Sequence, residues 1–322
     1  MSIDFVAVDV ETANSDRGSI CSIGWVKVTD GVVEEAGSML TKPPSDVDYF
    51  DGWNTAIHGI TEDDVEDAAP VVQGIQHVSS IVGNHMVVAH NAGFDISAIA
   101  RAMSYEDAAL PEWSFTCSMV LARRELDLIS YRLPIVADAL GVPLTSHHDA
   151  GADAAAAAGI TTALVSRREL NSVTDLMEAA QVGVGSLSSA GYVGSRVRPR
   201  GSQRSSGRAN SSGIRGSTYN PAANGEADPN HPLFGQVVVF TGTLSTLTRV
   251  EAKDAAAHFG ATTKSGVTGK TTLLVVGGGF AGDDPSEFST GKARKAVELR
   301  QAGQSIEVLT ERDFMDLLDA DA

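Results

Sequence analysis

The sequence predicts an α/β protein of two domains, one with a mixed sheet and a smaller one with a parallel sheet. A chain of 322 residues is long enough for about two domains, and 43% hydrophobic with 20% charged residues is ordinary for chains that bury a core. A stretch rich in Gly, Ser and Arg at 183–232 has almost no aliphatic periodicity. We therefore expect domains at 1–182 and 233–322, joined by a flexible linker at 183–232.

The first region begins with three strand patterns. β-branched apolar runs cover 3–10 and 19–28, and the turn sequence TDGV leads into a third run at 32–40. Further along, the pattern predicts a short buried strand and three helices, in this order: strand 85–89, helix 96–103, helix 133–140 and alanine-rich helix 150–165. A hairpin meander followed by alternating strands and helices predicts a mixed sheet.

The second region alternates strands and helices throughout. Its expected elements are strand 236–240, helix 249–259, strand 271–276, helix 291–302, strand 305–309 and helix 311–318. Strands separated by crossover helices predict a small parallel sheet. The sequence GVTGKTT within this region is not a P-loop, because position 264, where the first glycine would fall, is Lys.

Charge and hydropathy limit the classes of function. The net charge is −17, and residues 1–170 hold 9 Lys or Arg against 25 Asp or Glu. Such acidity argues against a basic phosphate-binding surface, unless carboxylates hold divalent cations that reverse the local charge. The absence of a long apolar run and of a signal-peptide pattern predicts a cytoplasmic protein that binds no membrane. Without a CxxC motif, Cys21 and Cys117 are expected to be buried thiols.

Three polar motifs carry the chemistry. Asp9 and Glu11 stand at i and i+2 of an apolar strand, so their side chains share one face, where ionised groups need a neutralising cation unless the strand end is solvated. Asp95 of HNAGFD follows a buried strand and is either a site residue or a helix N-cap. His148 lies five residues before Asp153, an acid in the first turn of the alanine-rich helix that could also simply favour the helix dipole.

In this order the three motifs resemble those of the DEDDh family of 3′-to-5′ exonucleases, which includes the proofreading epsilon subunit of bacterial DNA polymerase III. The resemblance covers about residues 3–168 and includes WNTAIHGITEDDV and YRLPIVADALGV; Asp rather than Tyr at position 149 favours the His branch of the family. It implies a ribonuclease-H-like fold with two divalent ions, Mg²⁺ or Mn²⁺. The implied ligands are Asp9, Glu11, Asp95 and Asp153.

The same resemblance implies further roles. His148 would be the general base, since the ordinary histidine pKa of about 6.5 suits that task; the adjacent His147 is a second candidate that the five-residue spacing disfavours. The terminal-nucleotide pocket would be shaped by Thr12, Ala13, His90, Asn91 and Phe94. Many relatives have Thr-Thr-Gly where this chain has Thr-Ala-Asn, which leaves the fit around the terminal sugar and base open. His58 could equally be a satisfied, partly buried histidine.

Residues 233–318 resemble a BRCT domain, closest to those of NAD-dependent DNA ligases and of the large subunit of replication factor C. The resemblance rests on TGTL after the first strand, Arg249 opening the first helix and Lys292 near the start of the second; the family's tryptophan in the last helix is absent, with Phe314 near its place. It implies an anion site that would take a DNA 5′-phosphate or a phosphorylated partner. The site residues would be Thr241, Gly242, Arg249 and Lys292. The alternative is a structural turn beside a solvated lysine.

Together these features predict a two-metal-dependent 3′-to-5′ exonuclease acting on single-stranded or frayed DNA ends, in DNA repair or replication proofreading, with a DNA polymerase as a candidate partner. An exoribonuclease and a non-catalytic nuclease-fold scaffold are the alternatives. The linker arginines either contact phosphates or belong to a solvated spacer; they are Arg196, Arg198, Arg200, Arg204, Arg208 and Arg215. Oligomeric state, preferred metal and BRCT ligand are left open by the sequence.

Overall fold

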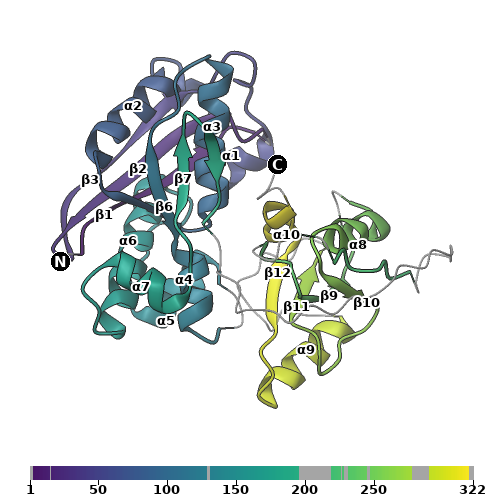
Figure 1. The fold of residues 1–322 in the computed structure, drawn as a ribbon. Helices are drawn as coiled ribbons and strands as arrows, with labels where there is room; N and C mark the ends of the chain where they lie inside the picture. The colour runs from purple at the N-terminus through teal and green to yellow at the C-terminus, as the bar shows by residue number, and fades with distance from the viewer. Residues whose placement is uncertain are drawn as a thin grey trace. The chain divides into compact units, whose positions relative to one another are not determined.

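The computed structural model describes residues 3–14, 16–128, 131–195, 219–225, 227, 231–244, 247–277 and 290–318. The chain divides into two compact units, the first made of Met1–Leu126 and Arg132–Arg196 and the second of Asp127–Tyr131 and Val197–Ala322 (Figure 1). The six linker arginines lie outside the described residues. Among the helices that the structure describes, none has the length and apolar character needed to cross a bilayer.

The first unit contains one sheet and its covering helices. Its elements are β1 (Phe5–Thr12), β2 (Ile20–Thr29), β3 (Val32–Lys42), α1 (Gly52–His58), η1 (Asp63–Val65), β4 (Ala69–Pro70), α2 (Val71–Val82), β5 (Met86–Ala89), α3 (Ala92–Tyr105), β6 (Trp113–Cys117), α4 (Ser118–Glu125), α5 (Leu133–Leu140), α6 (Ala150–Arg167), α7 (Val173–Ala180), β7 (Gly185–Ser188) and β8 (Gly191–Val193). The strand order is β4-β3-β2-β1-β5-β6-β7-β8. β1 pairs antiparallel with β2 and parallel with β5, so the predicted mixed sheet is confirmed.

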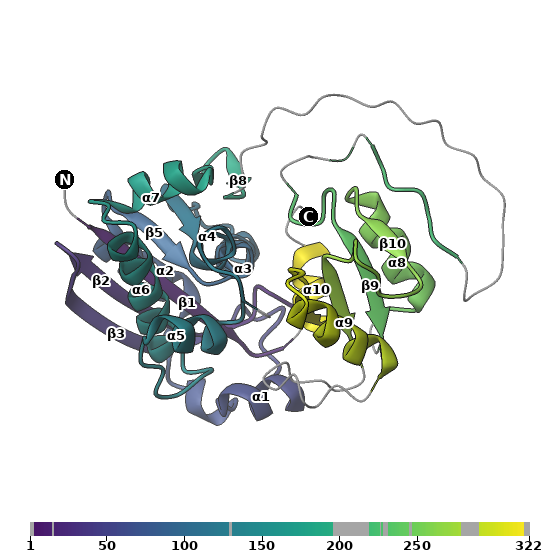
Figure 2. The ribbon, with the colours of Figure 1, turned by 90° about the horizontal axis from the view of Figure 1, so that it is seen from below.

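The two faces of this sheet are covered by different helices. Val6, Val8 and Val10 of β1 pack in one core with the buried residues of α2 and α3. The alternate residues of β1, which include Asp9 and Glu11, face the other way, as the period of two in a strand requires. There α6 contacts β1 and β2, and the turned view shows this helix across those strands (Figure 2). Cys21 and Cys117 are free and buried, as predicted.

The predicted linker is wrong at its beginning. β7 and β8 form a hairpin within 183–195 that extends the sheet beyond β6. Leu187 is fully buried in the core, and the Tyr192 ring stacks on Phe115 with centroids 5.7 Å apart. The sequence GSLSSAGYV contains too few apolar residues to show a strand period, so the hairpin depends on the existing sheet edge and core.

The second unit is built on a four-stranded sheet. Its elements are β9 (Val237–Thr241), α8 (Arg249–His258), β10 (Thr262–Lys264), β11 (Leu273–Val276), α9 (Gly291–Gln301), β12 (Glu307–Thr310) and α10 (Glu311–Leu318). All strands are parallel, in the order β10-β9-β11-β12, which confirms the predicted parallel sheet and adds the unpredicted β10. α8 and α10 contribute to the core on one face, and α9 to that on the other.

The end of the predicted linker also differs from expectation, because residues 219–225 pack on α8. The buried Lys253 donates from Nζ to the carbonyl of Tyr219 at 2.7 Å and to Oδ1 of Asn220 at 3.0 Å. The N–H of Asn224 donates to the carbonyl of Ala257 at 2.8 Å. A buried ammonium needs such oxygen partners, and this segment therefore belongs to the second unit.

Candidate active site

Asp9 lies close to α6 because the residue opposite it on β2 is a glycine. Asp9 pairs with Gly24 on β2, and a Cβ on Gly24 would collide with the carbonyl oxygen of Ala150. The first turn of α6 therefore lies directly against β2 beside Asp9. Asp149 caps this helix by accepting the N–H of Ala152 at 2.8 Å. The close approach brings Asp153, in the first turn of α6, next to the two acids of β1.

The four predicted acids gather at this point. Carboxylate oxygens of Asp9, Glu11 and Asp153 lie within 4.8 Å of one another. Asp95, in the first turn of α3, accepts the N–H of Val10 through Oδ1 at 3.1 Å, which fixes its carboxylate beside β1. Asp95 and Asp153 are only 2% and 4% exposed. Residues separated by 144 positions thus form one acidic cluster.

The cluster is electrostatically strained. Burial raises the pKa of Asp9 well above its ordinary value, and repulsion from Asp95, Glu11, Asp153 and Asp149 raises it further, in that order. A cation among these carboxylates would relieve the repulsion. The donor set consists of carboxylate oxygens, the ligands that Mg²⁺ and Mn²⁺ prefer. The residues present therefore fit a site for hard divalent cations.

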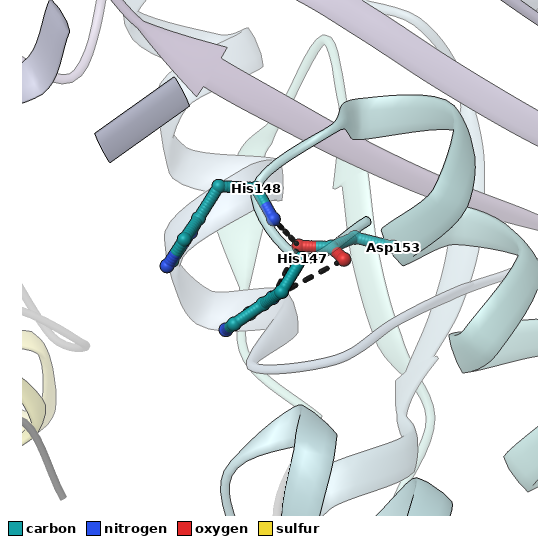
Figure 3. Close-up of side chains that lie close together, drawn as sticks. All are labelled: His147, His148 and Asp153. Atoms are coloured by element: carbon teal, nitrogen blue, oxygen red, sulfur yellow. Dashed lines mark hydrogen bonds and ion pairs between the residues drawn. The ribbon is translucent and has the colours of Figure 1, made fainter. Parts of the chain in front are cut away.

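Two adjacent histidines contact Asp153 in different ways (Figure 3). Nδ1 of His147 donates to Oδ2 at 3.0 Å and lies 3.2 Å from Oδ1. His148 instead donates its backbone N–H to Oδ2 at 3.1 Å, from a left-handed backbone with φ of 70°. The two rings stack with centroids 3.8 Å apart. The spacing singled out His148, whereas the ring that contacts Asp153 here is that of His147; the assignment of the base to His148 stays a prediction.

The second unit holds two cations, Lys292 and Arg249, at the end of β9. Lys292 donates from Nζ to the carbonyl of Phe240 at 2.8 Å, and Arg249 donates to the carbonyl of Gly242. Burial lowers the pKa of Lys292, and the charges of Arg249 and Lys253 lower it further. Nη1 of Arg249 is buried and has no hydrogen-bond partner among the described residues. Close cations with an unsatisfied buried N–H favour an anion at this place.

The other two predicted residues of this site, Thr241 and Gly242, lie against Thr290 and the backbone of Gly277. Oγ1 of Thr241 donates to Oγ1 of Thr290 at 2.8 Å, and Thr290 caps α9. Gly242 has φ of 70°, and a Cβ there would collide with the carbonyl of Gly277. Glycine is therefore required for conformation and for space. The structure thus brings together all four residues predicted for the anion site.

Comparison with known families covers both units. The exonuclease family RNase_T matches residues 6–161, and the BRCA1 C-terminus (BRCT) domain family matches residues 229–317. The chain joins an exonuclease domain to a BRCT domain. Both predicted folds are thereby confirmed.

Curated relatives match one domain each. The exonuclease domain is 30% identical over 159 residues to DNA polymerase III PolC-type of Clostridium perfringens, which covers 49% of this chain and 11% of that protein. The match to a putative bifunctional exonuclease/endonuclease protein of Mycobacterium tuberculosis is 31% identical and covers 51% of this chain and 26% of that protein. The BRCT domain is 44% identical over 89 residues to a DNA ligase of Maricaulis maris, covering 28% and 11%. The chain thus spans 11% to 26% of the length of these relatives.

Solved structures also resemble the exonuclease domain. Exonuclease X in complex with 5′ overhanging duplex DNA is 26% identical, with a TM-score of 0.42, and the match covers 54% of this chain and 92% of that one. A structure of exonuclease I matches with a TM-score of 0.43 at 15% identity, covering 56% of this chain and 44% of that one.

In the exonuclease domain, Thr12 and Ala13 are tied into the fold. Thr12 accepts two hydrogen bonds from Nδ2 of Asn54, at 2.7 Å to its carbonyl and 3.1 Å to Oγ1. His58 accepts the N–H of Ile60 through Nδ1 at 3.0 Å, so its Nε2 carries the proton and donates to the Thr12 carbonyl at 3.1 Å. Ala13 is fully buried. His58 is thus a satisfied histidine, and it positions the loop after Glu11.

The other predicted pocket residues flank α3. Nδ1 of His90 lies 2.9 Å from Oγ of Ser118, and Asn91 precedes α3 in a left-handed conformation. The guanidinium of Arg17 lies over the ring of Phe94, 5.5 Å from the ring centroid. These residues surround the helix turn that holds Asp95, but no contact in the structure tests their predicted role toward a nucleotide.

Sequence reasoning missed two residues that shape this site. Asn54 is buried and links α1 to the loop after β1, with a third bond of 3.0 Å from Nδ2 to the carbonyl of Asn14. Gly24 permits the contact between β2 and α6. A polar residue four positions before His58 was the available signal for Asn54. No local pattern distinguishes Gly24 from other glycines, because its neighbour lies more than 120 residues away in sequence.

Proposed function

We propose that the chain is a divalent-metal-dependent 3′-to-5′ exonuclease that releases nucleotides from DNA ends. The observation that carries the proposal is the convergence of Asp9, Glu11 and Asp153 within 4.8 Å beside the buried Asp95. Gathering four carboxylates, of which Asp95 and Asp153 are buried, costs stability, so the arrangement needs a compensating function. The match of residues 6–161 to an exonuclease family supports phosphodiester hydrolysis as that function.

Asp9, Glu11, Asp95 and Asp153 would hold two ions, Mg²⁺ or Mn²⁺. When bound, such ions neutralise the phosphate and stabilise charge on the attacking and leaving oxygens. The protein's part is positioning: the N–H of Val10 holds Asp95, and the N–H of His148 holds Asp153. These hydrogen bonds already hold both carboxylates in place, so binding the ions costs little side-chain conformational entropy.

His148 would accept a proton from the attacking water through its ring. Water then bonds to the phosphorus of the terminal phosphodiester, the bond to the 3′ oxygen breaks, and that oxygen takes up a proton. The products are a nucleoside 5′-monophosphate and a strand shorter by one residue with a free 3′-hydroxyl. His148 is suited to this step because its backbone is bonded to Asp153 while its ring remains partly exposed.

The BRCT domain would bind a phosphate group through Thr241, Gly242, Arg249 and Lys292. The buried Nη1 of Arg249 and the mutual repulsion of Arg249 and Lys292 support an anion there. We favour the 5′-phosphate of duplex DNA over a phosphorylated protein segment, since the BRCT domain is similar to that of a DNA ligase. DNA repair or replication proofreading is the proposed setting, with a DNA polymerase as a candidate partner.

Digestion of a 5′-labelled single-stranded DNA oligomer tests the nuclease proposal. With Mg²⁺ or Mn²⁺ we expect a ladder that shortens from the 3′ end, lost in Asp9→Ala and with EDTA. Glu35→Gln, at an exposed acid of β3, is the matched control and should retain the ladder. An equal rate on an RNA oligomer would shift the proposal toward an exoribonuclease. No cleavage of either polymer would leave the scaffold alternative.

Binding of hairpin duplexes with and without a 5′-phosphate tests the BRCT proposal. The full chain should bind the phosphorylated duplex at least tenfold more tightly, and Lys292→Ala should remove that difference. Lys295→Ala is the matched control, because Lys295 is an exposed residue of the same helix paired with Glu298. Equal affinity for both duplexes would reject a DNA 5′-phosphate as the ligand.

A further inference from the structure

Asp153 belongs to two clusters of potential metal ligands. One consists of the carboxylates of Asp9, Glu11 and Asp153, which the proposed function uses. The other consists of His147, His148 and Asp153, whose ligand atoms also lie within 4.8 Å of one another. Figure 3 shows the two imidazole rings side by side, with the ring of His147 and the backbone N–H of His148 directed at the Asp153 carboxylate. This second cluster has a different chemistry.

The geometry of the second cluster fits a single small ion. Two ligands bonded to one tetrahedral ion at about 2.0–2.1 Å lie roughly 3.3 Å apart. Nδ1 of His147 is already 3.0 and 3.2 Å from the two oxygens of Asp153. The ring of His148 stacks on that of His147, with an interplanar angle of 22°, and its ligand nitrogen lies within 4.8 Å of the other two ligand atoms, so a change of side-chain rotamer would bring it to the same ion.

The donor types select a different metal from that of the acidic cluster. Imidazole nitrogen suits Zn²⁺ and its transition-metal neighbours, whereas Mg²⁺ prefers carboxylate and water oxygens. Two imidazoles and one carboxylate on a tetrahedral ion leave one position for solvent. The side chain of His147 is 30% exposed, which gives an ion access from solvent.

We propose that His147, His148 and Asp153 form a zinc-type transition-metal site that competes with the nuclease cations for Asp153. An ion at this site would occupy both the shared carboxylate and the ring of the proposed base. Zinc would therefore inhibit the exonuclease, and this consequence rests on the proposed function. The binding site itself does not.

Zinc affinity of the tag-free full chain, measured by competition with a chromogenic chelator, tests the site. His147→Ala should weaken zinc binding at least tenfold. His77→Ala removes an exposed histidine of α2 and should leave zinc affinity unchanged. Asp9→Ala should also retain zinc, because Asp9 belongs only to the other cluster. Equal affinity in wild type and His147→Ala, or loss of zinc in Asp9→Ala alone, would overturn the proposal.

Imidazole nitrogen resonances identify the ligands independently of affinity. Adding zinc to chain labelled with ¹⁵N-histidine should shift the signals of His147 and His148 and leave that of His77 in place. A purely structural role of His147 would produce no such shift, and unshifted signals would reject the site. In the nuclease assay, zinc at fixed Mg²⁺ should inhibit wild type at least tenfold more strongly than His147→Ala, each compared with its own zinc-free rate. If the chain has no nuclease activity, the binding and resonance results still stand.

Discussion

Replacing Asp9 with Asn should stabilise the metal-free protein while abolishing its nuclease activity. Burial and neighbouring carboxylates raise the pKa of Asp9, so keeping this group ionised at neutral pH lowers the stability of the folded protein. At an effective dielectric constant of about 20, two unit charges 4.8 Å apart repel by about 3.5 kcal/mol. Proton uptake and solvent reduce that value, and we expect a net gain of about 1–2 kcal/mol for Asp9→Asn.

The stabilisation by Asp9→Asn should increase as the pH rises. A carboxyl with a raised pKa costs nothing below its ordinary value of 3.8, because it is protonated in both states. The cost grows as the pH rises from 3.8 to the folded-state pKa and is constant above it. The advantage of Asp9→Asn should therefore be complete at the high end of the pH range and shrink toward pH 4.

Tryptophan fluorescence during thermal unfolding measures this effect in the relevant domain, because all three tryptophans lie in the first unit. A gain of 1–2 kcal/mol corresponds to about 2–8 °C in Tm for a domain of this size. Glu35→Gln, the exposed control, should change Tm little. Saturating Mn²⁺ should place the Tm of wild type above that of Asp9→Asn, since a ligand at 100 times its Kd adds about 2.7 kcal/mol to the stability of the form that binds it. A metal-free Tm of Asp9→Asn at or below that of wild type would refute the reasoning.

Three further predictions follow from single contacts. Gly24→Ala should destabilise the exonuclease domain by at least about 1–3 kcal/mol and reduce nuclease activity, because its Cβ would collide with Ala150 and displace α6; unchanged melting and activity would contradict this. Burial alone would raise the pKa of Asp16, but hydrogen bonds led by those from Arg101 lower it, so Asp16→Asn should lose up to about 1 kcal/mol of stability above pH 4 and nothing once the pH falls below the folded-state pKa. A loss that persists in acid would exclude that cause. Leu187→Ala should cost about 2–5 kcal/mol in denaturant unfolding if β7 completes the core, whereas a loss below about 0.5 kcal/mol would show that the hairpin is dispensable.

Local patterns predicted those parts of the structure that depend on neighbours in sequence. Asp9 and Glu11 share a face of β1 because a strand alternates its side chains, and α5 ends at Gly141 because that residue adopts a left-handed conformation, with φ of 67°. The strand-helix alternation of the second domain likewise predicted its parallel sheet. The gathering of Asp95 and Asp153 beside Asp9 was predicted by family resemblance, since no local pattern carries contacts over such separations.

Only the tertiary structure decided the remaining features. The β7–β8 hairpin exists because Leu187 finds a core and β6 offers an unpaired edge, although its own sequence is that of a linker. The segment 219–225 is ordered by the buried ammonium of Lys253. His147 contacts Asp153 because the loop before α6 turns through the left-handed His148. The sequence by itself determined the chemistry of the acids and part of the elements: β1, β2, β3, β5, α3, α5 and α6 of the first unit, and those of the second unit except β10. Contacts between distant segments decided which groups meet, because their energies depend on burial and distance that no short window of sequence contains.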